Sequence, residues 1–484
     1  MVFFKNISQQ IKLVGIFLLI VLLHIIFKSY LLTYSGFWYD ETFGLFYSQQ
    51  DWGLIKHTSE WDMNPPLYYY FLWIWRNLFG ISEFAIRFSS VLFSALAAGM
   101  IYVFSLKHFN KTTAIIALLI YTSSNEIFFY AHEARCYSML FFLTLYSSYF
   151  YFNLLNKKSI SSIILLGLIN FLLIYTHYLT GLILVFQVLL LLVFFNKQFA
   201  KQVGIAFAIT IILAFWRFTK KTILLIFSHK KSFWLSKPTF YDLKTTVYDF
   251  FNGKEIFFVY AILIITLLFV IYKSSQRVEL KEFTSIKPLY ILFCSIGVVV
   301  ICYGASSITP LFTKRYVVYA IPFMCILIGF IVSQIANHKL KYIVTEVICM
   351  LSVYSFSKID FHTPKPMNYK DAMVFIKNEK TANTVVLVEN RDMRELFNYY
   401  YDRTIFSDLK NMNTKMSENS IYVISTIEDL NGIDFTKYSK VILTQTFVKA
   451  GPENEALLKT IAAHYKTQTS NTNYTGVDIF VFSN

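Results

Sequence analysis

Long apolar segments separated by short polar connections follow one another along the chain as far as Phe356. Most are close to 20 residues long, which is the length that a helix needs to cross about 30 Å of hydrocarbon. The pattern predicts eleven membrane-spanning helices, at about residues 12–33, 83–106, 112–130, 134–154, 159–176, 178–196, 203–226, 256–273, 288–306, 316–335 and 340–357. Bulky residues rather than a small-residue cleavage site follow the first segment, so we expect a retained anchor and not a removable signal.

The pattern changes after Phe356, where shorter apolar runs alternate with amphipathic stretches. Four runs are typical of strands: Val385–Val388, Ile421–Ile424, Val441–Leu443 and Val477–Phe482. Helical patterns lie between them at Tyr369–Asn378, Asp392–Tyr401 and Glu453–His464. Strands that alternate with helices indicate a small α/β domain whose sheet is at least partly parallel. We therefore predict a polytopic α-helical transmembrane domain at 1–357, with a first outer loop at 34–82, and a C-terminal α/β domain at 358–484.

Composition supports a membrane protein and removes nucleic acid as a partner. The 484 residues are 56% hydrophobic and 15% charged, which is too apolar for a soluble enzyme of this length. The formal net charge of +15 alone would fit a nucleic-acid-binding protein. However, the residues from Lys358 onward hold 15 basic and 15 acidic side chains, so the whole excess lies in the transmembrane domain. Basic residues in loops between spans set membrane topology, and we exclude a nucleic-acid partner.

Basic residues lie on alternate connections between the apolar segments. They are Lys5, Lys12, Lys107, Lys111, Lys157, Lys158, Lys197, Lys201, Lys273, Arg277, Lys281, Lys287, Lys339 and Lys341. By the positive-inside rule this side of the membrane is cytoplasmic, and an odd number of spans places the α/β domain on the other side. The five cysteines all lie in apolar segments without a CxxC pair, which favours small buried side chains over a disulfide framework.

A pair of adjacent carboxylates, Asp40-Glu41, lies in the first outer loop directly after Trp38 and Tyr39. Acidic groups beside the apolar slab cost desolvation energy, so a functional site is the first interpretation, with two solvated loop carboxylates as the alternative. Neighbouring residues point about 100° apart on a helix, which favours different roles for the two. Further along the loop, the apolar stretch Pro65–Trp75 is too short to span and is typical of a helix lying in the interface.

Four basic residues accompany the carboxylates on the predicted outer side: Arg87, just inside the second span, and Arg135, Lys314 and Arg315, in short outer connections where basic residues are disfavoured. Such cations need an anionic partner, which is either a lipid headgroup or a phosphate held by a guanidinium fork. Any one alone fits a headgroup anchor, and Arg87 also fits a helical pair with Glu83 four residues before it. The presence of Arg135, Lys314 and Arg315 together on the side of the carboxylate pair favours the phosphate.

A carboxylate base together with cations for a phosphate leaving group predicts group transfer from a polyprenyl-phosphate donor. Polar and aromatic side chains near these residues are candidate substrate contacts: Tyr39, Asn64, His132, Glu133, Tyr137, His177 and Tyr178. A lone histidine such as His177 is more typical of a hydrogen-bonded side chain than of a metal ligand. We assign no metal ligand and no cofactor, and leave a divalent metal open.

Five short motifs, in this order, resemble those of the GT-C glycosyltransferases. They are Trp-Tyr-Asp-Glu at 38–41, Asn-Pro-Pro-Leu-Tyr-Tyr at 64–69, Glu-Ala-Arg-x-Tyr at 133–137, Thr-His-Tyr at 176–178 and Arg-Tyr at 315–316 before Pro322. The chain is similar in particular to the bacterial branch of the dolichyl-phosphate-mannose–protein mannosyltransferases, which includes the aminoarabinose transferases of lipid A. The resemblance covers about residues 12–335 and is strongest over 37–140.

The resemblance implies an inverting displacement without a covalent intermediate, in which Asp40 is the general base on the acceptor hydroxyl. It also implies that Glu41 positions a substrate and that Arg87 and Arg135 organise the donor phosphate. Relatives often carry His where this chain has Asn64, and because an amide is a poor transition-metal ligand, this difference argues against a metal at the loop.

The implied protein is a multi-pass hexosyl- or pentosyltransferase of the bacterial inner (plasma) membrane with an extracytoplasmic C-terminal domain. Its partners would be the lipid-linked sugar donor, membrane lipids and an acceptor that is a glycan, a glycolipid or a protein.

A transporter or flippase of lipid-linked glycans is the main alternative. It should carry charges deep in its spans or inverted repeats. Few charged residues lie deep in the predicted spans, with Arg217, Lys220 and Lys221 as the exceptions, and the sequence shows no repeat. A membrane-anchored interaction protein that displays the α/β domain would leave the spans and the outer cations without a purpose. We therefore predict an enzyme, with its sugar and acceptor unassigned.

Overall fold

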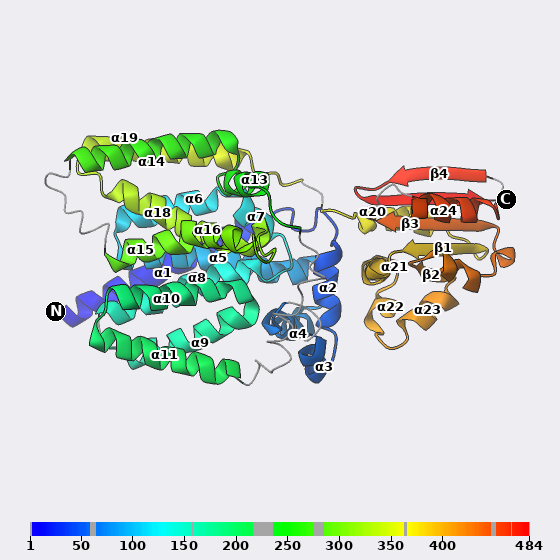
Figure 1. Ribbon diagram of the computed structural model, residues 1–484, viewed down its shortest axis with the longest axis horizontal. Coiled ribbons are helices and arrows are strands. Elements are labelled where there is room, and N and C mark those ends of the chain that lie inside the picture. Colours follow the sequence, from blue (N-terminus) through cyan, green and yellow to red (C-terminus); the bar gives the residue numbers. More distant parts are fainter. Residues whose placement is uncertain are drawn as a thin grey trace. The chain divides into compact units, whose positions relative to one another are not determined.

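The computed structural model describes residues 2–58, 64–156, 158–215, 236–274, 285–362, 365–446, 452–465 and 467–483 (Figure 1). Its contacts divide the chain into two compact units. The helical unit comprises Met1–Tyr30, Lys56–Tyr68 and Arg87–Asp360, and the loop–sheet unit comprises Leu31–Ile55, Tyr69–Ile86 and Phe361–Asn484. The loop–sheet unit thus joins most of the first outer loop to the C-terminal part of the chain.

The helical unit is built of helices, most of which are apolar. They are α1 (Val2–Ser29), α5 (Glu83–His108), α6 (Lys111–Thr122), α7 (Asn125–Ala131), α8 (Tyr137–Asn156), α9 (Ile160–Thr176), α10 (Gly181–Val193), α11 (Lys197–Phe215), α13 (Phe240–Phe250), α14 (Lys254–Ser274), α15 (Ile286–Leu292), α16 (Val298–Ala305), α17 (Lys314–Val317), α18 (Ile321–Ser333) and α19 (His338–Ser357). The end of the predicted span 203–226, with the charged Arg217, Lys220 and Lys221, lies outside the described residues.

Seven of the described helices are long and apolar enough to cross a membrane. The pairs α6–α7 and α13–α14 pass the same test together but are bent by 63° and 79°, and counting each as one span gives up to nine. The shorter helices Ile160–Thr176 and Tyr178–Val193 would also have to cross to reach eleven, so that number stays a prediction. A polytopic helical membrane protein with a small C-terminal α/β domain is confirmed.

The bend between α6 and α7 interrupts what the sequence predicts as one span. The Ser124 side chain accepts a hydrogen bond from the Ile127 amide and so caps a new helix. Asn252 fills the break, because its Oδ1 accepts from the Asn125 amide at 2.8 Å and its Nδ2 donates to the Ser123 carbonyl at 2.6 Å. Backbone groups freed by the bend are therefore satisfied by a side chain from between α13 and α14, as a break within an apolar unit requires.

Helices α6 and α18 pack with their backbones in close approach. A Cβ on Gly329 of α18 would lie 2.7 Å from the backbone oxygen of Thr113 on α6, so only glycine fits there. One apolar cluster joins these two helices to α14 and α19 and includes Ile116, Tyr260 and Ile348. The close contact is typical of helix packing in membranes, where small residues at the interface replace the hydrophobic drive present in water.

In the loop–sheet unit, α2 (Tyr39–Tyr47) comes from the first outer loop, and α3 (Trp52–Thr58) and α4 (Leu67–Phe79) belong to it in part. The C-terminal part contributes α20 (Tyr369–Glu379), α21 (Arg394–Tyr401), α22 (Arg403–Ser407), α23 (Met412–Glu418) and α24 (Pro452–Ala462).

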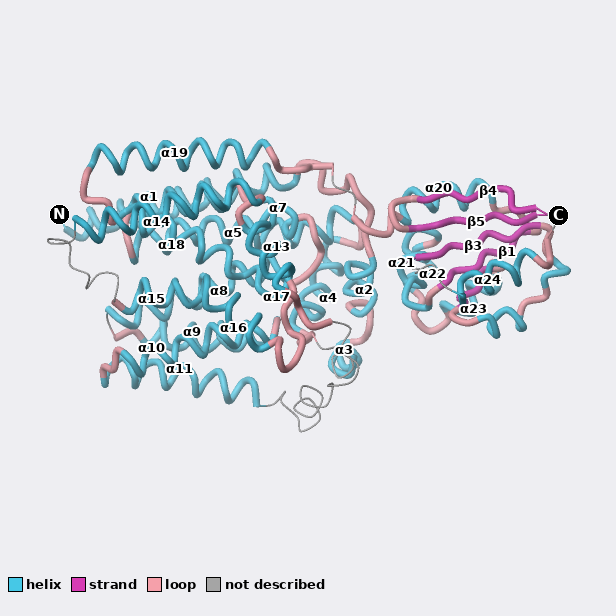
Figure 2. Tube along the Cα trace, turned by 45° about the horizontal axis from the view of Figure 1, so that its top comes forward, coloured by secondary structure: helices cyan, strands magenta, loops and turns pink. Residues whose placement is uncertain are grey.

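A five-stranded sheet forms the centre of this C-terminal part (Figure 2). Its strands are β1 (Thr384–Glu389), β2 (Ile421–Ile424), β3 (Lys440–Thr446), β4 (Thr467–Asn473) and β5 (Val477–Ser483), in the order β2-β1-β3-β5-β4. β1 runs parallel to β2 and β3, whereas β5 is antiparallel to β3 and β4. The four predicted strands and the partly parallel sheet are confirmed, and β4 is an additional strand at one edge.

Candidate active site

Asp40 and Glu41 occupy the first turn of α2. Negative charge is favourable there, because the free backbone N–H groups lie at the N-terminal end of a helix. The two side chains have different surroundings, since Glu41 is fully buried and Asp40 is half-buried. Glu41 Oε2 accepts a hydrogen bond from the backbone N–H of Trp38 at 3.3 Å, which caps the helix. Glu41 thus holds the start of α2, whereas Asp40 keeps exposed surface.

Tyr39 connects the start of α2 to carboxylates from the C-terminal part of the same unit. Burial raises the pKa of the Tyr39 phenol, and the charges of Asp392, Glu395 and Asp40 raise it further. The phenol therefore stays protonated at neutral pH and can donate a hydrogen bond beside Asp40. Asp392 belongs to the turn η6 (Arg391–Met393), and Glu395 to the first turn of α21, which packs against α2.

The motif around Asn64 leads into α4, and its Tyr68 belongs to the helical unit. Asn64 is half-buried before the two prolines, which favour the start of a helix. Tyr68, in the first turn of α4, is 5% exposed, and its hydroxyl interacts with Ser89, Ser90 and the charge of Arg135. The tyrosine of this motif is therefore part of the surroundings of Arg135.

Arg135 and Arg315 converge on His177, although these residues come from three distant parts of the chain. Burial, together with the positive charges of Arg135 and Arg315, lowers the pKa of His177 from 6.5 to about 4. The His177 ring meets the Tyr316 ring edge-on with 4.9 Å between centroids, and the Arg315 guanidinium lies 5.9 Å from the same ring. At pH 7 the histidine is neutral, so it offers one hydrogen-bond donor and one acceptor. The two positively charged guanidinium groups lie near this uncharged ring.

The connection from α7 to α8, which carries His132, Glu133 and Arg135, is fixed by hydrogen bonds to neighbouring helices. The Ser90 hydroxyl donates to the Glu133 carbonyl at 2.7 Å, and His132 Nε2 donates to the Lys28 carbonyl at 2.7 Å. Glu133 is 2% exposed and Arg135 8% exposed. A rigid, buried backbone therefore presents the Arg135 guanidinium.

Tyr137 and Arg87 are two further buried members of the predicted site. Tyr137 begins α8 and packs its ring 4.9 Å from that of Tyr130, and Arg315 is close enough to act electrostatically on both hydroxyls. Arg87 is 1% exposed in α5. A guanidinium at this depth is retained only when acceptors or anions surround it.

Lys314, the immediate neighbour of Arg315, has carboxylate partners within the protein. Its Nζ lies 2.8 Å from Glu126 Oε1 on α7 and 2.9 Å from Asp249 Oδ2 on α13. These two carboxylates neutralise the ammonium charge, so Lys314 joins α17 to α7 and α13.

The turn η1 (Tyr178–Thr180) orients His177 and Tyr178. His177 Nδ1 accepts a hydrogen bond from the Leu179 amide at 3.3 Å, so this nitrogen carries no proton and Nε2 is the donor of the neutral ring. The hydroxyl of Tyr319, which lies just before α18, donates to the Leu179 carbonyl at 2.7 Å and holds the same turn. Tyr178 is half-buried beside it.

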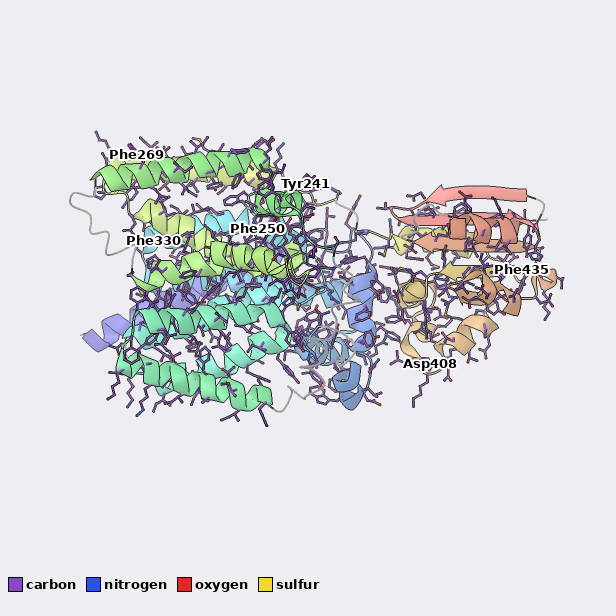
Figure 3. The ribbon with its side chains drawn as sticks, viewed as in Figure 1. Tyr241, Phe250, Phe269, Phe330, Asp408 and Phe435 are labelled. Atoms are coloured by element: carbon purple, nitrogen blue, oxygen red, sulfur yellow. The ribbon has the colours of Figure 1, made fainter. Side chains whose placement is uncertain are left out.

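An apolar cavity of about 580 Å³ lies among α13, α14, α15, α16 and α18 of the helical unit. Its lining side chains are all apolar and include Phe251, Ala261, Met324 and Phe330, the last of which is labelled in Figure 3. Such a lining suits a hydrocarbon chain and no charged group. Within the part of the chain that the structure describes, no group of three or more His, Cys, Asp or Glu side chains could hold a metal ion.

The predicted site residues fall into the two units. Arg87, Arg135, Lys314, Arg315, Asn64, His132, Glu133, Tyr137, His177 and Tyr178 belong to the helical unit, whereas Asp40, Glu41 and Tyr39 belong to the loop–sheet unit. Sequence reasoning missed Tyr68 and Tyr316, although each stands inside a motif that carries a predicted residue. It also missed Glu126 and Asp249, for which the sequence offers no signal, because their partner Lys314 is far away along the chain.

Comparison with known proteins matches one segment of the chain to a family and the whole chain to solved structures. Residues 63–217 match the model of the dolichyl-phosphate-mannose-protein mannosyltransferase family. Curated proteins give no match. The crystal structure of ArnT from Cupriavidus metallidurans bound to undecaprenyl phosphate aligns with a TM-score of 0.61 and 13% identity over 97% of each chain. Its apo state aligns with a TM-score of 0.60 and 12% identity over 99% of this chain and 98% of that chain.

A second solved protein shares the architecture less completely. The apo oligosaccharyltransferase of Archaeoglobus fulgidus aligns with a TM-score of 0.52 and 10% identity, over 87% of this chain and 69% of that chain. At such low identity these likenesses establish the fold, and the family match covers the segment that contains Asn64, Arg87, Arg135 and His177. The chain therefore shares the fold of ArnT, and its segment 63–217 matches the dolichyl-phosphate-mannose-protein mannosyltransferase family.

Proposed function

We propose that the protein is a membrane glycosyltransferase that moves a sugar from a polyprenyl-phosphate donor to an acceptor outside the cytoplasm. The convergence of Arg135 and Arg315 on a neutral His177 carries this proposal. Two guanidinium groups at one place match the forked hydrogen bonding of a phosphate. The family match and the undecaprenyl phosphate bound to ArnT support the same class of donor.

In the proposed reaction, Asp40 takes the proton of the acceptor hydroxyl while the hydroxyl oxygen attacks the anomeric carbon of the donor sugar. The bond between that carbon and the phosphate oxygen breaks, and polyprenyl phosphate leaves with the bonding electron pair. Arg135 and Arg315 stabilise the charge that develops on the leaving phosphate, and the direct displacement inverts the anomeric centre. The half-buried position of Asp40 in the first turn of α2 suits a base that must meet an incoming substrate.

Several predicted residues have supporting roles in this proposal. Glu41 holds the start of α2 through its hydrogen bond to Trp38, and Lys314 joins helices through its two carboxylates rather than binding the donor. His177 donates from Nε2 to a phosphate oxygen. The wall of the donor site is formed by side chains of the buried motifs, namely Arg87, Asn64, His132, Glu133, Tyr137 and Tyr178, with Tyr68 added.

The apolar cavity beside α14 is the proposed place of the donor's prenyl chain. Its lining is apolar throughout, and it begins at α13, the helix whose Asp249 binds Lys314 next to Arg315. A chain lying there gains hydrophobic free energy in proportion to the surface it buries, roughly 25 cal/mol per Å².

The acceptor in this proposal is a glycolipid, a lipid-linked glycan or a protein hydroxyl, and the transferred sugar is a hexose or a pentose. The alternation of basic connections supports a location in the bacterial inner membrane with the C-terminal α/β domain outside the cytoplasm.

The test uses the purified full chain in lipid nanodiscs with undecaprenyl-phosphate sugars that are radiolabelled in the sugar. A lipid and glycan extract from the cell envelope supplies acceptors. We expect label to move from the donor to an extract component, with one polyprenyl phosphate released for each sugar transferred. The proposal fails if no label moves from any donor while the same protein, in vesicles, speeds the passage of a fluorescent lipid-linked glycan between leaflets, because that outcome identifies a flippase.

A further inference from the structure

The helix that carries Asp40 is built against the C-terminal part of the chain. Both belong to the loop–sheet unit, in which α2 packs against α21. The Phe37 ring lies 5.1 Å from that of Tyr399, and the Phe46 ring lies 6.2 Å from that of Phe406, measured between centroids. The residue just before the N-cap of α2 and a residue near its end therefore both contact side chains that follow hundreds of residues later.

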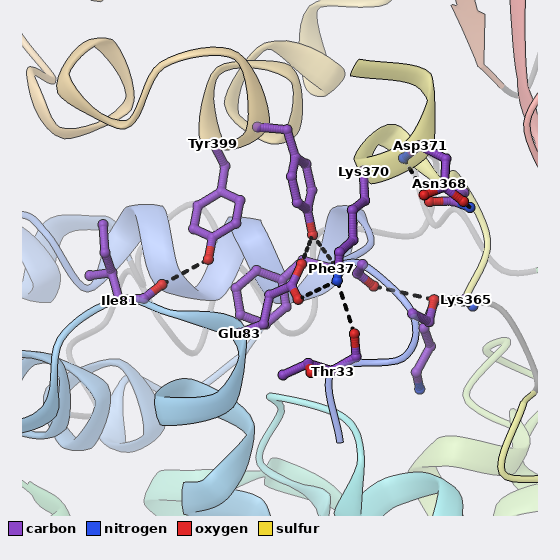
Figure 4. A network of polar contacts seen from close by, with 12 residues as sticks. Thr33, Phe37, Ile81, Glu83, Lys365, Asn368, Lys370, Asp371 and Tyr399 are labelled. Atoms are coloured by element: carbon purple, nitrogen blue, oxygen red, sulfur yellow. Dashed lines mark hydrogen bonds and ion pairs between the residues drawn. The ribbon is translucent and has the colours of Figure 1, made fainter. Parts of the chain in front are cut away.

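Tyr400 joins the two ends of the first outer loop with a single hydroxyl, which bonds to Phe37 and Glu83; Figure 4 labels both of these partners. Its oxygen accepts a hydrogen bond from the backbone N–H of Phe37, and its O–H donates to Glu83 Oε1. Phe37 directly precedes the N-cap of α2, and Glu83 is the first residue of α5. Burial, together with the charge of Glu83, raises the pKa of Tyr400, so the phenol keeps the proton that it donates.

Further hydrogen bonds from the C-terminal part reach the same two ends of the loop. Lys370 Nζ donates to Glu83 Oε2 and to the Thr33 carbonyl, both at 2.9 Å. The Lys365 amide donates to Ser35 Oγ at 2.7 Å, and the Tyr399 hydroxyl donates to the Ile81 carbonyl at 2.9 Å; Figure 4 draws these contacts near one another.

The backbone just before α2 lies too close to this network for a side chain. A Cβ on Gly36 would lie 2.8 Å from Lys370 Cβ and 2.8 Å from the Tyr400 hydroxyl. Glycine at this position therefore allows the approach on which the bond from Phe37 to Tyr400 depends.

We propose that Tyr400, supported by Lys370, is a positioning residue that sets the place of Asp40 for transfer. The proposal rests on the proposed glycosyl transfer and deepens it, because it gives the C-terminal α/β domain a direct part in holding the base. Phe37 lies three residues before Asp40 in the chain. A shift of the Phe37 backbone would therefore also shift the first turn of α2 and the Asp40 carboxylate. Displacing a reacting group by about 1 Å can cost on the order of 10²-fold in rate.

The first arm of the test measures hydrogen exchange and needs no activity. Tyr400→Phe keeps the ring against Tyr399 and removes only the hydroxyl. We expect amide exchange in the peptide covering 37–47 to become faster by about 5- to 10-fold, the loss expected for one hydrogen bond. Tyr401→Phe is the matched control, because the Tyr401 hydroxyl has no hydrogen bond to the described residues and its ring stacks on Phe397. The control should leave exchange at 37–47 unchanged.

The second arm measures transfer by the same variants. For Tyr400→Phe we expect kcat to fall by about 10- to 100-fold with little change in the KM for the donor, since the phosphate contacts proposed here lie in the helical unit. Lys370→Met should act in the same direction, and it gives an independent variant if Tyr400→Phe does not fold. A general loss of stability would also lower the amount of active enzyme. It would not, however, raise amide exchange at 37–47 specifically.

The outcomes separate this inference from the proposed function. Faster exchange at 37–47 together with a lower kcat supports the positioning role. Unchanged exchange, or faster exchange with wild-type kcat, overturns it. If the wild-type enzyme transfers no sugar at all, the proposed function fails, whereas the exchange arm still reports whether Tyr400 holds α2.

Discussion

Lys314 and Glu126 are 188 residues apart in the sequence, yet the lysine Nζ lies 2.8 Å from the glutamate Oε1. Asp249 contributes a second carboxylate at 2.9 Å. The side chain of Glu126 is 10% exposed, so the bond keeps a carboxylate paired in a place with little water. One ammonium group thereby connects α17, α7 and α13, and the bent segment α6–α7 is held at its α7 part.

Lys314→Met is expected to destabilise the protein rather than to weaken donor binding. The substitution leaves the Glu126 carboxylate buried without its cation, which costs about 1–3 kcal/mol. The midpoint of thermal unfolding in detergent should fall by several degrees, while Lys254→Met, at an exposed lysine of α14, should not change it. An unchanged midpoint with a large increase in the donor Kd would instead return Lys314 to the donor site.

Replacing Arg135 or Arg315 by Lys should impair turnover although the charge is retained, because an ammonium cannot make the forked pair of hydrogen bonds. The loss of one charge-assisted bond is worth about 1.5–3 kcal/mol, which corresponds to roughly 10- to 100-fold in kcat/KM. Arg391→Lys, at an exposed arginine in the turn η6, is the control and should behave as wild type. Wild-type kinetics in both site variants would leave these residues as headgroup anchors.

His177 should make the stability of the protein depend on pH. Its pKa of about 4 in the folded state lies below the ordinary 6.5, so between these values the unfolded chain binds a proton that the folded protein does not. The contribution of His177 to the free energy of unfolding should therefore be fully present above pH 6.5, and it should be lost as the pH falls toward 4. His177→Asn keeps a capping acceptor for Leu179 and removes the titration, so its thermal midpoint in detergent should fall less over this range. Parallel curves for the two proteins would show that His177 does not contribute.

Filling the apolar cavity should discriminate between donors by chain length. Ala261→Phe places a ring where the prenyl chain is proposed to lie, so the KM for an undecaprenyl donor should rise by about tenfold or more, whereas that for a short-chain analogue should change little. Ala208→Phe, on an exposed face of α11, adds the same ring elsewhere and serves as the control. Equal effects on the KM of long-chain and short-chain donors would show that the prenyl chain does not lie in this cavity.

The apolar pattern predicted most of the fold, because span length and strand composition are local properties. The bend at Ser123 and Ser124 could not be predicted, since the Asn252 side chain that satisfies it comes from another helix. β4 was missed because Thr467–Asn473 is wholly polar and lacks the alternation that marks a half-buried strand. A polar edge strand of this kind has no pattern of its own, and among the described strands β4 pairs with β5 alone.

The candidate site was only partly predictable, for the same physical reason. Motif order indicated Asp40, Arg135 and His177, but the partners of a charged group depend on contacts across the fold. The two carboxylates on Lys314 and the bond from Tyr400 to Phe37 join residues 65 to 363 positions apart, which no local pattern reveals. The sequence likewise separates the first outer loop from the C-terminal domain, whereas their contacts form one unit.

The most direct test of the account is the rate of sugar transfer by Asp40→Asn, measured beside donor binding. The amide keeps the shape of the side chain but cannot accept the proton, and general-base catalysis contributes typically about 10²–10⁴-fold. Transfer from a radiolabelled undecaprenyl-phosphate sugar should fall by that factor while the donor Kd stays near wild type. Asp51→Asn, at an exposed carboxylate of the same loop, should transfer normally. An Asp40→Asn enzyme within a few-fold of the wild-type rate would contradict the mechanism and remove Asp40 as the base.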